Sequence, residues 1–196
     1  MIRPGSTNEV TLKSGKWVFI DIGFANKAKS CGVLFDDGSP EELTFSQAVK
    51  KICKFVKAND TPVNLVIEAP LSVAFDSNGN PKGRRIEKQN KKTRYWYVSL
   101  GTTVMVGAMY LIKAIIDFEP TAEIRLFEGF VSFKDSNTRT NHSRDVLMLR
   151  DIVIKEDREA IISPESLKMD DSDLLKSAFW VAGVDLGVPP VLIKNG

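Results

Sequence analysis

Two acidic residues lie where apolar runs of this sequence would bury them. Asp21 is within the run 17–22, which is otherwise apolar, and Glu68 ends the run 63–68 directly before Ala69 and Pro70. Burying a carboxylate is costly unless it finds a partner or a metal. The structural alternatives are an Asp21 that bonds to a neighbouring backbone turn and a Glu68 that faces water at the end of a strand.

Three other acids are candidates for the same site. Glu128 ends another predicted strand, where it is either a third strand-end ligand or a surface residue. Asp170 and Asp173 begin a predicted helix and are three residues apart, so both can project from one helix face. Acids in a first helical turn also cap free amides and complement the helix dipole, which is the alternative for this pair and the preferred explanation for Asp171.

A site made of carboxylates alone suits hard divalent cations. Magnesium takes oxygen ligands, often from a few carboxylates together with water and substrate phosphates. Two such ions can activate a water molecule and stabilise the leaving oxygen of a phosphodiester. The single histidine, His142, leaves little for a histidine-rich site or a histidine-based triad. We interpret it as a structural or surface residue at a helix start, with a proton shuttle as the alternative.

A basic segment stands out from an otherwise acidic chain. The net charge is +2, yet residues 82–94 hold seven basic side chains and one acid, and the remainder carries −4. The segment leads into Tyr95, Trp96 and Tyr97. Cations that neutralise phosphates, beside aromatics that stack on bases, favour nucleic-acid binding, whereas the alternative is a solvated loop anchored by its aromatics. The predicted nucleic-acid-binding residues are Lys82, Arg84, Arg85, Lys88, Lys91, Lys92, Arg94 and Trp96.

Length and composition indicate one globular domain. At 196 residues, with 43% hydrophobic and 27% charged residues, the chain is neither a disordered tail nor a rod. We expect a flexible tail over 1–15 and a single domain over 16–196, with a basic loop insertion at about 70–97. The longest uncharged apolar window, 98–112, is too short to span a membrane, and the N-terminus lacks the apolar stretch of a signal peptide.

The two cysteines, Cys31 and Cys53, have no metal-binding or redox spacing and are typical of buried thiols. We therefore expect a cytoplasmic protein. No phosphate-binding glycine motif is present in the sequence.

The hydrophobic pattern predicts a mixed α/β sheet. The predicted strands are 16–24, 31–35, 42–45, 63–68 and 122–130, and the predicted helices are 46–58, 99–118, 143–154 and 170–186. Because strand–helix–strand crossovers are right-handed, the strand ending at Glu68 should lie parallel to the first strand. Their carboxyl ends then share one edge, where such sheets bind ligands. Small residues between 101 and 108 suit close packing of a helix in the core or in a homodimer.

This order of elements and acids resembles the ribonuclease H-like (retroviral integrase) superfamily. Asp21 in FIDIG, Glu68 in VIEAP, and Asp170 with Asp173 in DDSDLLKSAFWVAG match its first-strand, fourth-strand and last-helix acids. The helix pair resembles the RuvC-type resolvases. VIEAPLSVAF followed by GRRIEK is more similar to a predicted nuclease family catalogued as a domain of unknown function. The helix reads Asp-Leu-Leu-Lys where Asp-Ala-Leu is usual, so which aspartate is the ligand stays open.

The resemblance implies a five-stranded sheet in the order 3-2-1-4-5, flanked by helices, and a nuclease that uses Mg²⁺ or Mn²⁺. Asp21 would bridge two metals, Glu68 and Asp173 with Asp170 would complete the site, and the basic loop would hold the nucleic-acid backbone, DNA or RNA. Two alternatives remain. One is a non-catalytic nucleic-acid-binding or scaffolding module on this fold. The other is a hydrolase of a small phosphate ester or nucleotide, for which the basic loop would be dispensable.

Overall fold

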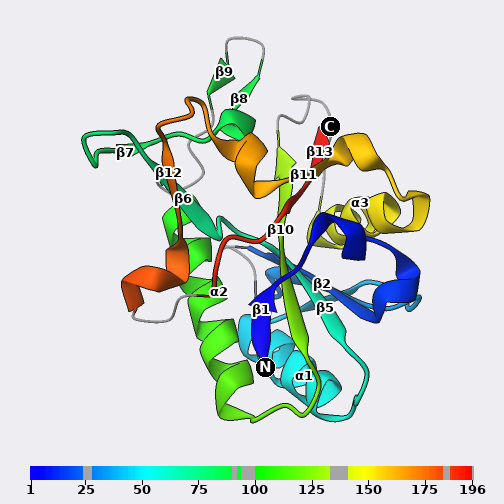
Figure 1. The fold of residues 1–196 in the computed structure, drawn as a ribbon. Helices are drawn as coiled ribbons and strands as arrows, with labels where there is room; N and C mark the ends of the chain where they lie inside the picture. The colour runs from blue at the N-terminus through cyan, green and yellow to red at the C-terminus, as the bar shows by residue number, and fades with distance from the viewer. Residues whose placement is uncertain (24–27, 90–91, 94–99, 133–140, 183–185, 196) are drawn as a thin grey trace.

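A mixed sheet with helices on both faces forms the centre of the protein (Figure 1). The structure, a computed structural model, describes residues 1–196 except 24–27, 90–91, 94–99, 133–140, 183–185 and 196. Helices α1 (Phe45–Lys57) and α2 (Leu100–Asp117) cover one face, and α3 (His142–Lys155) covers the other. Of the helices in these residues, none is both long and apolar enough to cross a membrane.

Five strands of the sheet form where the sequence predicts strands, and they adjoin one another. In spatial order they are β4 (Glu41–Leu43), β3 (Cys31–Phe35), β2 (Lys16–Ile22), β5 (Val63–Glu68) and β10 (Ile124–Ser132). β2, β5 and β10 are parallel, and β3 runs antiparallel to β2. The parallel strands β2 and β5 are buried on both faces, which explains their nearly continuous apolar sequences.

Within the described residues the sheet has eight strands, so the prediction of five is wrong in number. The additional strands are β1 (Ile2–Pro4), β13 (Val191–Asn195) and β11 (Ile161–Ile162). β1 pairs with the first half of β10 and β13 with its second half, both in parallel, and β11 pairs with β13. Strands of two to five residues are too short to show a period of their own; β1 and β13 form because β10 offers them an edge, and β11 forms on the edge of β13.

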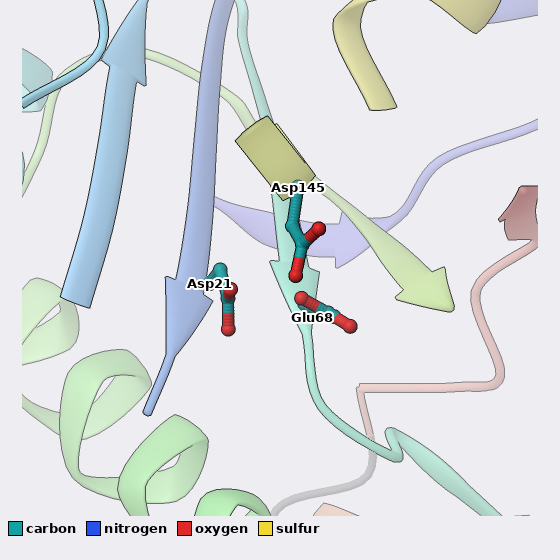
Figure 2. Close-up of side chains that lie close together, drawn as sticks. All are labelled: Asp21, Glu68 and Asp145. Atoms are coloured by element: carbon teal, nitrogen blue, oxygen red, sulfur yellow. The ribbon is translucent and has the colours of Figure 1, made fainter. Parts of the chain in front are cut away.

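The two-residue period of a strand decides which helix each side chain meets. In β2, Val18 and Ile20 pack with α1 and α2, whereas Trp17 and Phe19 pack with α3. Asp21 continues the second series and therefore lies on the α3 face (Figure 2).

The insertion after β5 contains strands where the sequence predicts a loop. β6 (Ser72–Phe75), β7 (Pro81–Lys82) and β12 (Leu174–Ser177) form a second sheet, and β8 (Lys88–Gln89) pairs with β9 (Lys92–Thr93). Short 3-10 helices lie at Thr7–Glu9, Leu12–Ser14, Arg85–Glu87, Arg158–Ala160, Pro164–Leu167 and Ala178–Ala182.

The predicted helix 170–186 is therefore wrong within its described residues. Leu174–Ser177 instead pairs antiparallel with β6, so a long-range strand partner overrides the local helical pattern. The small residues of α2 pack inward: Ala108 is buried, and a Cβ on Gly107 would lie 3.3 Å from Ile22.

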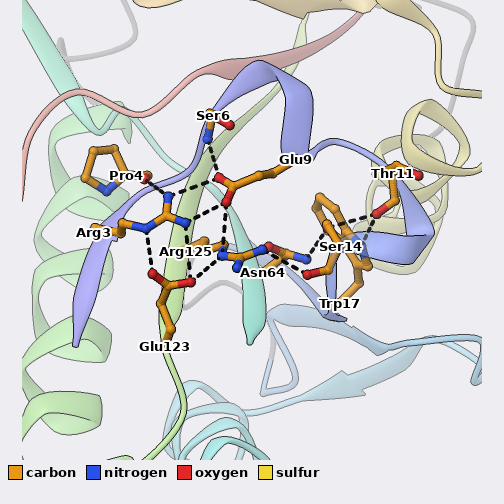
Figure 3. A network of polar contacts seen from close by, with 10 residues as sticks. All are labelled: Arg3, Pro4, Ser6, Glu9, Thr11, Ser14, Trp17, Asn64, Glu123 and Arg125. Atoms are coloured by element: carbon orange, nitrogen blue, oxygen red, sulfur yellow. Dashed lines mark hydrogen bonds and ion pairs between the residues drawn. The ribbon is translucent and has the colours of Figure 1, made fainter. Parts of the chain in front are cut away.

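Residues 1–15, expected to be a flexible tail, are tied to the sheet by charged side chains (Figure 3). Arg3 bonds to Glu123 at 2.7 Å and to Glu9 at 3.0 Å, and Arg125 bonds to Glu123 at 2.6 Å. Val10 is fully buried in the core on the α3 side. An arginine-rich network and one apolar anchor thus hold a segment whose composition alone indicates a loop.

This network predicts a pH-dependent contribution to stability. The Arg3 guanidinium lowers the pKa of Glu9 from its ordinary 4.5 to about 2. The stabilisation is therefore complete above pH 4.5 and is lost as the pH falls towards 2. We expect Glu9→Gln to reduce the free energy of unfolding by about 2 kcal/mol at pH 7. In urea denaturation this difference from the wild type should shrink between pH 4.5 and 3; a difference that stays constant would contradict the assignment.

Candidate metal centre

The pairing of β2 with β5 brings the first two predicted acids together. In the parallel register Asp21 is directly opposite Glu68, near the carboxyl ends of both strands. Paired residues point to the same face of a sheet, and here that face is covered by α3. Both side chains are buried, with 6% and 7% of the residue exposed.

The start of α3 supplies a third acid, Asp145, which the sequence pattern did not single out. α3 begins after Asn141, whose side chain accepts the N–H of Arg144 at 2.9 Å. Glycine at position 32, opposite Asp21 in β3, allows this helix start to approach, since a Cβ there would lie 2.3 Å from the His142 carbonyl oxygen. Asp145 is in the first turn of α3 and is 5% exposed.

Asp21, Glu68 and Asp145 converge from two strands and one helix (Figure 2). One carboxylate oxygen of each lies within 4.8 Å of the others. Two unit charges at that separation repel by about 3.5 kcal/mol at an effective dielectric constant of about 20. A divalent cation would turn this repulsion into attraction, and buried carboxylate oxygens are the ligands that magnesium and manganese accept. The residues present therefore fit a divalent ion.

His142 contacts the first acid of this cluster. Its Nδ1 lies 2.7 Å from Asp21 Oδ2, and 29% of its side chain is exposed. An ionised carboxylate can only accept, so the imidazole donates from Nδ1 and holds the Asp21 carboxylate in one orientation. The histidine interpreted as a structural or surface residue thus belongs to the candidate site.

Glu128 is directed to the other face of the sheet. It follows Phe127, which packs on the α3 side, so the two-residue period turns its side chain away from Asp21 and Glu68. There it is fully buried and bonds to Arg84. The predicted third strand-end ligand is consequently an ion-pair partner.

Asp170 and Asp173 lie with a lysine, outside the cluster of three acids. Lys82 Nζ contacts Asp170 at 2.7 Å and Asp173 at 2.8 Å. Lys82, together with the N–H groups of Asp170 and Met169, lowers the pKa of Asp173. The predicted helix is absent from the described residues here. The helical spacing of three residues therefore does not place these two acids on one face.

The basic segment divides into buried and exposed cations. Arg84 is 0% exposed and Lys82 is ion-paired, so neither presents a free charge to a phosphate. Arg85 and Lys88 are exposed, although Arg85 Nε donates to the Lys168 carbonyl at 2.9 Å. Lys92 belongs to β9. The predicted residues Lys91, Arg94 and Trp96 lie outside the described part of the chain.

Comparison of the sequence with protein-family models, with curated proteins and with solved structures gives no match. The case for function therefore depends on the geometry of this site.

A metal bound by the three acids should stabilise the fold. At a Mn²⁺ concentration of 100 Kd, binding adds about 2.7 kcal/mol, or a rise in Tm of about 5–10 °C. Glu68→Gln should abolish that rise. In the absence of metal, the Tm of Glu68→Gln should be no lower than that of the wild type, because one of three mutually repelling charges is removed.

Asp170→Asn is the matched control for this thermal denaturation experiment. It removes an acid outside the cluster and should keep the full Mn²⁺ response. If Glu68→Gln responds to Mn²⁺ like the wild type, these acids do not form the binding site.

Proposed function

We propose that this protein is a divalent-metal-dependent nuclease on a ribonuclease H-like fold. The observation that carries the proposal is the convergence of buried Asp21, Glu68 and Asp145 on one sheet edge. The neighbour order β4-β3-β2-β5-β10 is compatible with the 3-2-1-4-5 order of that superfamily and so supports the fold assignment, while the sheet continues beyond β10 with β13 and β11. Asp145 on α3 takes the place that the resemblance gave to Asp170 and Asp173.

Each side chain of the site has a distinct task in this proposal. When bound, the metal ions supply positive charge for a phosphodiester transition state and make water a stronger nucleophile. Asp21, held by His142, is the central ligand, and Glu68 and Asp145 complete the set. The His142 side chain is 29% exposed, and in this proposal its second nitrogen exchanges a proton with the leaving group.

Nucleic acid is the proposed substrate because of the segment that follows the site. The chain leaves the site at Glu68 and forms the insertion that carries exposed Arg85 and Lys88 and the β8–β9 hairpin. Residues 82–94 concentrate positive charge on a chain that is otherwise acidic, as phosphate binding requires.

Cleavage of labelled DNA and RNA in Mn²⁺ tests the catalytic proposal. We expect Asp21→Asn and Asp145→Asn to lower the rate by about 10³-fold, because several kcal/mol of charge stabilisation disappear with the metal. Asp171→Asn, which replaces an exposed acid outside the cluster, should keep its rate. Equal rates in all of these variants would exclude the site. Binding without cleavage by the folded wild type would instead favour a non-catalytic binding module.

The salt dependence of binding tests the basic insertion. Replacing Lys88, Lys91, Lys92 and Arg94 by glutamine should weaken binding and lower the slope of log Kd against log salt by about 0.7–0.9 for each phosphate that is no longer neutralised. Lys50→Gln with Lys54→Gln, on the exposed side of α1, is the control and should leave the slope unchanged. An unchanged slope in the fourfold variant would remove this segment from the interface.

A further inference from the structure

The backbone directly after Glu68 is bonded to a buried ion pair on the opposite face of the sheet. Glu128 Oε2 accepts the N–H of Leu71 at 2.8 Å, and Arg84 Nη1 donates to Ser72 Oγ at 2.7 Å. Leu71 and Ser72 are the third and fourth residues after Glu68. The two charged side chains therefore bond to the chain just where it leaves the strand that carries a proposed metal ligand.

The ion pair itself has good geometry and no exposure to solvent. Arg84 Nη1 and Nη2 donate to the two carboxylate oxygens of Glu128 at 2.9 and 2.8 Å, and Arg84 Nε donates to Glu87 at 3.0 Å. All three residues are 0% exposed. Burial alone would lower the pKa of Arg84, but the charges of Glu128 and Glu87 raise it overall, so the guanidinium stays ionised.

Stability alone does not account for this arrangement. Removing charged groups from water is so costly that well-packed apolar residues in their place are often neutral or stabilising. Apolar residues, however, cannot accept a hydrogen bond from the Leu71 N–H or donate one to the Ser72 hydroxyl. Without these bonds the strand end would be free to shift, and metal ligands must be held within about 0.5 Å.

We propose that Arg84 and Glu128 are positioning residues that hold the Glu68 carboxylate in its metal-binding place. This inference rests on the proposed function, because it assumes that Glu68 binds a metal. It gives Arg84 a role in the site without contact with substrate, and it gives Glu128 a role without contact with metal.

Mn²⁺ titration calorimetry on the full chain tests the assignment. Glu128→Gln and Arg84→Lys should bind Mn²⁺ about 10-fold more weakly or worse, the usual effect of removing a residue that orients a ligand. Glu87→Gln is the matched control. It also changes a buried partner of Arg84, but the Glu87 carboxylate bonds to the side chain and the N–H of Arg84 rather than to the chain that leaves β5. Its Mn²⁺ affinity should stay within about twofold of the wild type.

A measurement on the wild type covers the case in which these variants do not fold. Because coupling between sites is reciprocal, a metal that depends on the position of Glu68 must also stabilise the bonds that hold it. Hydrogen exchange of the Leu71 amide should slow at least about fivefold when Mg²⁺ is added. The Ser6 amide, which bonds to Glu9 in the N-terminal network, should not respond.

The outcomes separate the two proposals. A wild type that binds neither Mn²⁺ nor Mg²⁺ overturns the proposed function and this inference with it. If the wild type binds metal, two results would overturn the positioning role alone. One is a Mn²⁺ affinity of Glu128→Gln and Arg84→Lys equal to that of Glu87→Gln. The other is an exchange rate of the Leu71 amide that does not change with Mg²⁺.

Discussion

The parallel pairing of β2 with β5 is the constraint on which the rest of the site depends. Its register sets Asp21 against Glu68 on one face and at one edge. A shift of one residue would send Glu68 to the opposite face, and no adjustment of α3 could recover it. The other features of the site adapt to this pair: glycine at position 32 admits the start of α3, and His142 holds the Asp21 carboxylate.

Two glutamates on neighbouring parallel strands, Glu68 at the end of β5 and Glu128 in the middle of β10, have different surroundings because successive side chains of a strand point to opposite faces. Glu68 continues the series that faces α3 and joins two aspartates, whereas Glu128 is directed to the other face and joins an arginine. Since both are glutamates close to the predicted end of a strand, residue type alone does not distinguish a member of the acidic cluster from an ion-pair partner. The apolar neighbours in the strand do, because Val66 packs with α3 on the Glu68 side and Leu126 packs with α1 and α2 on the Glu128 side.

The strongest sequence signals were long and periodic, and the structure agrees with them. Five strands and the meeting of Asp21 with Glu68 follow from apolar runs and crossover handedness, whereas the order of the strands was implied by the resemblance. The short strands depend on an edge that only the folded chain provides, and the predicted helix 170–186 gave way to pairing with β6. Asp145 carried a usable signal, since it follows His142 by three residues at the start of a predicted helix. The same spacing at Asp170 and Asp173 predicted a helix start that the described residues do not form.

The basic segment shows why a count of charges does not define an interface. Arg84 and Arg85 are adjacent, yet one is fully buried between two glutamates and the other is exposed. If Arg84 positions Glu68, the start of the insertion is fixed beside the candidate metal site, and the exposed cations follow later in the same insertion. A nucleic-acid backbone held by those cations would then be placed relative to the metal by a rigid, buried ion pair rather than by a loose loop. Proximity of this kind matters because a reacting group about 1 Å out of place can cost about 10²-fold in rate.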